Sequence, residues 1–191
     1  MRGGTCDRRS GPYGYGYQHG TSRHVEPHRI SGLAAAVMMC AVAPASAREV
    51  VPYDGGVQPG TIVVKTAERR LYFVVGDGTA IRYPVAVGRP GKQWQGWAQV
   101  NGKHVQPAWT LPAEVKADNP KLPDVIPGGT PGNPMGPRAL TLSGGEYAIH
   151  GTNKPSSIGT FASYGCIRMY NQDILDLFDR VSVDTPVVVA R

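Results

Sequence analysis

One cysteine and one histidine stand sixteen residues apart near the end of this sequence, each in a setting that suits nucleophilic chemistry. Cys166 directly follows Gly165, and a glycine there lets the chain turn tightly and expose the thiol. His150 closes an apolar run and precedes Gly151. A free thiol has a pKa of about 8.5 and attacks as the thiolate, so it needs a neighbouring base or positive charge. We therefore predict that Cys166 is a nucleophile and that His150 is its base.

Each of these residues also has a structural interpretation. Only Cys166 remains if the N-terminal segment with Cys6 and Cys40 is removed, and a lone thiol in an oxidising compartment is either buried packing or a working group. His104 is the other histidine beyond the N-terminal segment, but it lies in a polar stretch. The end of an apolar strand favours His150 over His104 as the base.

Neighbouring groups complete the predicted site. No carboxylate flanks His150 closely, so the carbonyl of Gly151 is a candidate for holding the imidazole tautomer. The backbone N–H groups of Gly165 and Cys166 are candidates for an oxyanion hole. Arg168 follows the cysteine by two residues, and an extended segment places both side chains on one face. There the guanidinium could bind a substrate carboxylate through two parallel hydrogen bonds, although a surface arginine paired with an acidic neighbour is the alternative.

Residues 1–47 have the layout of a leader. An apolar run over Ile30–Val42 follows Arg23 and Arg29 and precedes Ala45-Ser-Ala47, as in a secretory signal peptide. The run is too short for a span of roughly 20 residues, so we expect no stable membrane span after cleavage. Residues 1–24 are unusually long for this role and are candidates for a mis-assigned start. We predict a lead-in over 48–60, a catalytic domain over 61–191, and export to the periplasm or cell envelope.

Composition sets further limits. The chain of 191 residues is the size of one domain, and 25 glycines with 17 prolines indicate short strands with many connections. Residues 48–191 carry 15 Lys and Arg against 12 Asp and Glu, a net charge of +3, and this mild basicity argues against a nucleic-acid binder, which normally carries a dense basic stripe. We expect a monomer that uses no metal and no cofactor.

The hydrophobic pattern predicts a mostly β fold. Residues 61–66 and 71–75 read as a hairpin, 80–87 as a third strand, 139–143 and 146–149 as strands that deliver His150, and 183–189 as a last strand. The interval 89–138 reads as a long loop with recurring prolines and three tryptophans, which we interpret as an ordered lid or groove wall. Asn171 is predicted to cap a short helix whose Asp173 suits the helix dipole and whose Ile174, Phe178 and Val181 share one face.

The combined motifs resemble those of a known family. Ile149-His-Gly-Thr152, then Ser163-x-Gly-Cys-Ile-Arg168, then Asn171 and a short helix resemble the L,D-transpeptidases of the YkuD catalytic domain family, over roughly 61–191. Asn133-Pro-Met-Gly136 is similar to the loop that precedes the histidine strand in that family. One position departs, because many relatives carry histidine where this chain has Tyr164. The base must then be His150 alone.

The resemblance implies a YkuD-like β-sandwich and a reaction on peptidoglycan stem peptides. Cys166 would attack the stem between residue 3 and D-Ala at position 4, release D-Ala, and pass the acyl group to the side-chain amine of a second stem as a 3→3 cross-link. It also implies that Gly151 fixes the tautomer, and that Arg168, with Ser163, Tyr164 and Gly165 around the thiol, binds or shapes the substrate end.

Three rival functions stay open. An exported cysteine peptidase, an L,D-carboxypeptidase in effect, would deliver the same acyl group to water, although papain-like peptidases usually place cysteine before histidine in the chain. A transpeptidase could instead attach an envelope protein to peptidoglycan, since the sequence does not identify the acceptor amine. A wall-binding module with an inert Cys166 is the non-enzymatic alternative.

Overall fold

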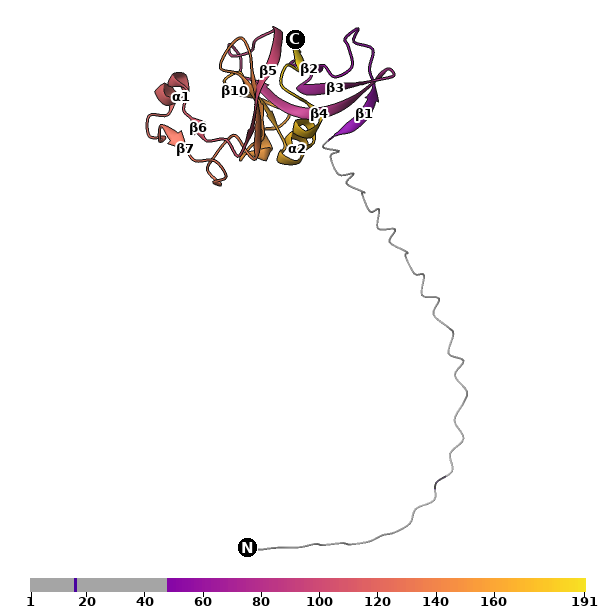
Figure 1. The fold of residues 1–191 in the computed structure, drawn as a ribbon. Coiled ribbons are helices and arrows are strands. Elements are labelled where there is room, and N and C mark those ends of the chain that lie inside the picture. Colours follow the sequence, from indigo (N-terminus) through magenta and orange to yellow (C-terminus); the bar gives the residue numbers. More distant parts are fainter. Residues whose placement is uncertain (1–15, 17–47) are drawn as a thin grey trace, which may run out of the picture. The chain divides into compact units, whose positions relative to one another are not determined.

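The computed structural model describes Gly16 and residues 48–191, and the predicted leader at 1–47 lies outside the described residues apart from Gly16. Residues 48–191 form a mostly β fold, as the sequence predicts, with two α-helices where the sequence predicts one (Figure 1). The strands are β1 (Glu49–Pro52), β2 (Ile62–Lys65), β3 (Arg70–Gly76), β4 (Thr79–Gly88), β5 (Gly96–Val105), β6 (Trp109–Thr110), β7 (Val125–Ile126), β8 (Arg138–Leu142), β9 (Ala148–His150), β10 (Phe161–Ser163), β11 (Ile167–Met169) and β12 (Pro186–Ala190). The helices are α1 (Ala113–Asp118), the 3-10 turn η1 (Pro155–Ser157) and α2 (Asn171–Arg180).

The first strands of the described chain and its last strand build one layer of the sandwich. The predicted hairpin is confirmed as the antiparallel pair β2 and β3, and the predicted third strand is β4, which pairs with β3. The C-terminal strand β12 lies parallel to β2 and antiparallel to β5. Within the predicted lead-in, β1 pairs antiparallel with β4, so this segment contributes a short strand to the sheet.

The second layer carries the residues of the predicted site. Its strand order is β4, β11, β9, β8, β5, in which β11 and β9 are parallel. The long strands β4 and β5 belong to both layers and join them at their edges. The alternating side chains of the two layers therefore enclose one core between them.

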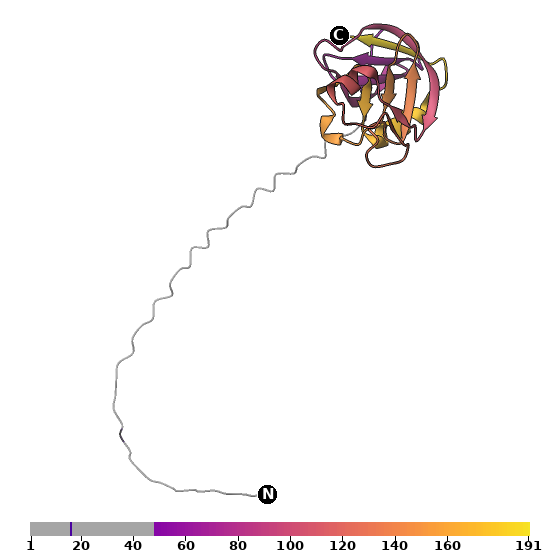
Figure 2. The same cartoon turned by 90° about the vertical axis from the view of Figure 1, so that its left-hand side faces the viewer.

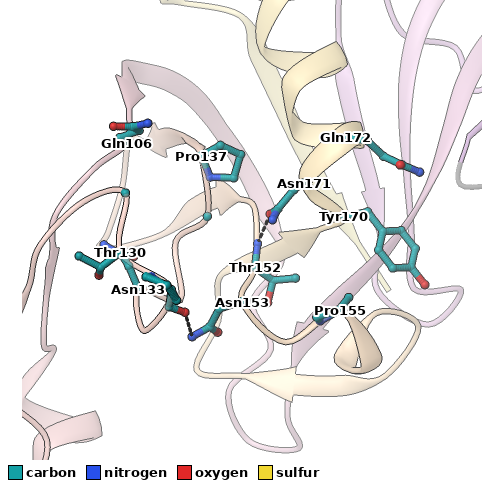
Figure 3. Close-up of a pocket in the computed structure, with 13 residues that line it drawn as sticks. Gln106, Thr130, Asn133, Pro137, Thr152, Asn153, Pro155, Tyr170, Asn171 and Gln172 are labelled. Carbon is teal, nitrogen blue, oxygen red and sulfur yellow. Dashed lines mark hydrogen bonds between the residues drawn. The ribbon is translucent and has the colours of Figure 1, made fainter.

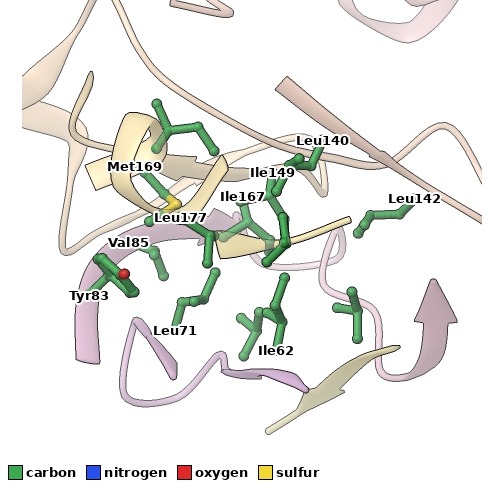
Figure 4. Packing of buried hydrophobic residues seen from close by; sticks show 14 of the residues in the cluster. Ile62, Leu71, Tyr83, Val85, Leu140, Leu142, Ile149, Ile167, Met169 and Leu177 are labelled. Atoms are coloured by element: carbon green, nitrogen blue, oxygen red, sulfur yellow. The ribbon is translucent and has the colours of Figure 1, made fainter. Parts of the chain in front are cut away.

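This core is apolar and contiguous. Ile62 and Leu71 from the first layer face Ile149 and Ile167 from the second, and all four are at most 1% exposed (Figure 4). Leu177 of α2 packs into the same cluster. Because side chains alternate along a strand, burying Ile149 and Ile167 turns the side chains of their neighbours in sequence to the opposite face of the sheet.

The interval 89–138 differs from the predicted loop. It contains the ten-residue strand β5, which pairs with β8 and β12. Only Ala98 and Val100 of β5 are buried apolar residues, so its hydrophobic alternation is too weak to see in the sequence. The prolines do mark an excursion with β6, α1 and β7, which projects from one side of the sandwich (Figure 1) and lies in front of the strands in Figure 2.

The predicted C-terminal helix is α2, and its apolar face is confirmed by Ile174, Phe178 and Val181, which pack in or against the core. The predicted cap is wrong, because Tyr170 precedes the helix and no side-chain cap is formed. Asn171 is the first helical residue, and its Oδ1 atom accepts a hydrogen bond from Thr152 instead. No helix among the described residues is long and apolar enough to cross a membrane.

Candidate active site

The sheet register brings the predicted residues together. On the parallel strands β9 and β11, Arg168 lies opposite His150, and Ile167 lies opposite Ile149. Since the two isoleucines face the core, His150 and Arg168 share the other face of the sheet. Cys166 precedes Arg168 by two residues, directly before β11, and its sulfur is close enough to Arg168 for their charges to interact. The register thus pairs the imidazole with the guanidinium, and the thiol lies two residues before the guanidinium.

Small residues flank this group on the same face. Ala139 of β8 lies opposite His150, and Ala86 of β4 lies opposite Arg168. Both alanines are buried, and each contributes only a methyl group beside the larger side chains. The strands next to β9 and β11 therefore place only small side chains opposite the imidazole and the guanidinium.

The turn that carries the thiol is held from inside by Ser163. This side chain is fully buried, and its hydroxyl donates to the Cys166 carbonyl at 2.5 Å. The same oxygen accepts a hydrogen bond from the Gly165 N–H at 3.1 Å. The shaping role predicted for Ser163 fits these contacts, but the Gly165 N–H is already engaged. The Cys166 N–H remains the better candidate for an oxyanion donor.

Gly165 cannot be replaced without strain. Its φ of +125° lies outside the range that side chains with a Cβ adopt readily. A Cβ on Gly165 would also lie 2.6 Å from the ring of Tyr147. Trp94 stacks on Tyr147 with ring centroids 4.6 Å apart, and its indole N–H donates to the Gly165 carbonyl at 3.0 Å. Trp94 thus supports the turn, which agrees with the interpretation of the tryptophan-bearing interval as an ordered wall.

The side chain of Tyr164 contacts the segment that contains β6, α1 and β7. Its hydroxyl donates to Asp118 at the end of α1 at 2.6 Å, and the Arg89 guanidinium lies 4.0 Å from the centre of its ring. Arg89 also pairs with Asp118 at 2.9 Å. Sequence reasoning missed Arg89 and Asp118, because nothing in their spacing connects them with residue 164.

The imidazole of His150 is held in one tautomer. Its Nδ1 atom lies 2.7 Å from the Gly151 carbonyl, which can only accept, so Nδ1 carries the proton and Nε2 keeps its lone pair. The ring is 4% exposed. Burial, and secondarily the positive charge of Arg168, lower the pKa of His150 to about 4, against the carbonyls of Gly151 and Pro134. His150 is therefore neutral at pH 7 and able to accept a proton.

The thiol is also neutral at rest. Burial raises the pKa of Cys166, while the backbone N–H of Ala148 and the charge of Arg168 oppose this shift. In the described part of the chain no hydrogen bond joins the sulfur to the His150 ring, and Sγ lies 4.0 Å from the Glu146 carbonyl. The thiol is therefore not ionised in advance by contact with the imidazole. The site has instead a neutral thiol and a neutral base, beside one positive charge.

Arg168 supplies that charge, and it is not neutralised by the protein. Its side chain is half-buried, and no hydrogen bond or ion pair engages the guanidinium within residues 48–191. Burial lowers the pKa of Arg168, while nearby Cys166 and Tyr164 oppose this. A half-buried cation without a partner favours an anionic ligand. His104, by contrast, lies on β5, where its Nε2 is 3.3 Å from the Thr141 hydroxyl.

The fold and the site together define a β-sandwich domain of the L,D-transpeptidase class. The model of the L,D-transpeptidase catalytic domain (YkuD) matches residues 59–189, and the chain belongs to this family. It is 44% identical over 133 residues to the probable L,D-transpeptidase YbiS of Escherichia coli (strain K12). The alignment covers 66% of this chain and 43% of that protein. The chain thus spans less than half the length of this curated relative.

Solved structures show the same fold. An L,D-transpeptidase from Mycobacterium smegmatis aligns with a TM-score of 0.55 at 18% identity, over 69% of this chain and 58% of that one. A second structure, from Brucella melitensis, aligns with a TM-score of 0.51 at 40% identity, over 78% of this chain and 96% of that one. That protein is described as a probable carnitine operon oxidoreductase, a name that differs from those of the other relatives. The family match and the curated relatives both identify the fold as that of an L,D-transpeptidase.

Proposed function

We propose that this protein is a peptidoglycan L,D-transpeptidase that works through a Cys166 acyl-enzyme, with His150 as general base and Arg168 as the binding group for a substrate carboxylate. The observation that carries the proposal is the shared face of β9 and β11, where a thiol and a neutral imidazole flank a guanidinium without a protein partner. The stem of peptidoglycan ends in a free carboxylate, so its D-Ala end suits Arg168. The peptide bond before that residue would then lie near the sulfur.

The first half-reaction follows from the protonation states. As Sγ of Cys166 attacks the carbonyl carbon, Nε2 of His150 takes the thiol proton, and the carbonyl π electrons move to oxygen. In this proposal the Cys166 N–H donates to the oxyanion. When the C–N bond breaks, His150 returns the proton to the departing D-Ala amine, and a thioester remains. The Nδ1–H bond to Gly151 holds the ring in one orientation throughout.

The second half-reaction uses the same groups in reverse. A neutral side-chain amine of a second stem attacks the thioester, and His150 removes a proton from the nitrogen. The C–S bond then breaks, and the proton passes to Sγ. Attack by water instead would give the free acid, the product of an L,D-carboxypeptidase, and attack by the amine of an envelope protein would attach that protein to the wall.

A defined tetrapeptide donor tests the proposal. Mass spectrometry should detect the cross-linked dimer and free D-Ala with the wild type, and neither with Cys166→Ser. Loss of general-base catalysis in His150→Gln should lower kcat/KM about 10²- to 10⁴-fold. His104→Gln is the matched control and should keep full activity. A free acid without dimer would favour the carboxypeptidase, and an active Cys166→Ser variant would refute the mechanism.

The cellular setting is part of the same proposal. We infer that residues 1–47 are removed during export, and that the enzyme acts in the periplasm or cell envelope as a monomer. The layout of residues 23–47, with two arginines, a short apolar run and Ala45-Ser-Ala47, supports this. The protein recovered from the envelope fraction should have the mass of residues 48–191, with Arg48 as its first residue.

A further inference from the structure

A cleft of about 810 Å³ opens beside the strand end that carries His150. One side is formed by Gln106 and the loop 129–137, and the other by the start of α2, with Thr152 and Asn153 between them (Figure 3). Cys166, His150 and Arg168 are not among its lining residues. Its volume is that of a typical small-ligand site, and the reaction described above does not use it.

The lining has an unusual chemistry for a protein of this charge. None of the thirteen residues around the cleft is acidic, basic or histidine. They are instead amides, hydroxyls, glycines and prolines: Gln106, Asn133, Asn153, Asn171 and Gln172; Thr130, Thr152 and Tyr170; Gly129 and Gly136; Pro131, Pro137 and Pro155. Such a surface offers neutral donors and acceptors beside rigid apolar rings. It suits an uncharged ligand that carries many hydroxyl or amide groups.

Two of the amides are held in place by the backbone. Asn171 accepts a hydrogen bond from the Thr152 N–H through Oδ1 at 2.8 Å, which leaves its NH₂ end for a ligand. Asn153 donates from Nδ2 to the Gly132 carbonyl at 3.0 Å, which leaves its Oδ1 as an acceptor. Each side chain thus offers one free end in a fixed position. Because these side chains are already ordered, less conformational entropy is lost when a ligand binds to them.

A close backbone approach joins the cleft to the base. A Cβ on Gly136 would lie 2.6 Å from Oδ1 of Asn171 and 2.7 Å from the Thr152 nitrogen. Thr152 directly follows Gly151, whose carbonyl orients the His150 ring. The cleft is therefore lined by Thr152, two residues after the base His150.

We propose that this cleft binds the neutral glycan of the substrate, through the hydroxyl and acetamido groups of N-acetylated hexose units. The inference rests on the proposed function, because the stem peptide brings a sugar chain to the same molecule. The charged ends of stem peptides are poorly matched by this uncharged lining, whereas Arg168 is suited to a carboxylate. The hydroxyls of a pyranose match the amides, and its C–H face matches the rings of Pro137, Pro155 and Tyr170.

Binding is tested first with a glycan alone. Tetra-N-acetylchitotetraose, titrated into the ¹⁵N-labelled protein, should shift the side-chain NH₂ resonances of Asn171, Gln106 and Gln172. Cellotetraose, which lacks the acetamido groups, should shift them less. The double variant Gln106→Ala/Gln172→Ala should weaken the binding about fivefold or more, the effect of losing one or two hydrogen bonds. Gln99→Ala, an exposed control on β5 outside the cleft, should bind as the wild type does.

Turnover separates this inference from the proposed function. With the wild type, kcat/KM for a disaccharide-linked tetrapeptide should exceed that for the free tetrapeptide about fivefold or more, and the double variant should lose this preference while keeping its rate on the free peptide. Equal rates on both donors, without shifts from chitotetraose, would overturn the glycan site but leave the transpeptidase intact. Shifts caused by the free peptide alone would make the cleft a peptide site. A wild type that is inactive on both donors would refute the function instead, while the titration still decides glycan binding.

Discussion

Replacement of Asp173 by asparagine should make the protein more stable at neutral pH. Asp173 lies in the first turn of α2, fully buried, and neither carboxylate oxygen has a hydrogen-bond partner. Burial, with a smaller contribution from Asp176 that Arg48 opposes, raises its pKa to about 6. The sequence predicts a favourable interaction of this carboxylate with the helix dipole. The structure shows that desolvation outweighs it.

The magnitude and the sign follow from linkage. An aspartate whose pKa is raised in the folded state from 3.8 binds its proton more tightly there than in the unfolded chain. The contribution of Asp173 to stability is therefore largest below pH 4 and is lost as the pH rises to about 6. Each pKa unit is worth about 1.4 kcal/mol, which sets an upper bound of about 3 kcal/mol. Relaxation of the folded state around the ionised carboxylate reduces this, and we expect about 1–2 kcal/mol at pH 7.

Urea unfolding of the wild type and Asp173→Asn from pH 3.5 to pH 8 measures the effect. The two proteins should have similar free energies of unfolding at pH 3.5, and the variant should exceed the wild type by a difference that grows to a plateau above pH 6. Asp54→Asn changes an exposed carboxylate and is the control. A constant difference across this range would show that Asp173 does not titrate as argued.

Three further substitutions test how the site is built. Gly165→Ala, which forces a positive φ on alanine and a contact with Tyr147, should cost about 2 kcal/mol or more in urea unfolding, and an unchanged midpoint would contradict the backbone geometry. Asn133→Ala should cost about 1–3 kcal/mol, because Nδ2 donates to three carbonyls and Oδ1 accepts from Met135. Ser163→Ala should lower kcat more than it raises KM in the tetrapeptide assay, whereas the exposed control Ser156→Ala should change neither.

The strands that could be predicted are those with a strong apolar pattern. Residues 61–66 and 71–75 alternate or run together as β-branched and aromatic residues, and the hairpin they predict is present. The run before His150 likewise became β9. In each case the buried side of the strand produces a hydrophobic pattern that can be recognised in the sequence.

The parts that could not be predicted depend on partners far away in the chain. Strand β5 is stabilised by β8 and β12, which begin more than thirty residues later, and its own apolar content is small. The contact of Tyr164 with Asp118 spans 46 positions. Periodicity reports what a segment buries, and it carries no information on which polar groups long-range folding brings together.

The same limit explains why the motif identified the groups of the site but not their charge states. The sequence indicates an activated thiol, since Cys166 and His150 are the residue types that form such pairs. Burial of both groups gives a neutral pair instead, and the adjacent charge of Arg168 further disfavours the imidazolium, although it opposes the raised pKa of the thiol. A bound carboxylate would compensate Arg168 and remove that penalty. The same carboxylate would also remove the stabilisation that Arg168 gives to the thiolate, so we expect the thiol proton to move to His150 during the attack on the carbonyl carbon rather than before it.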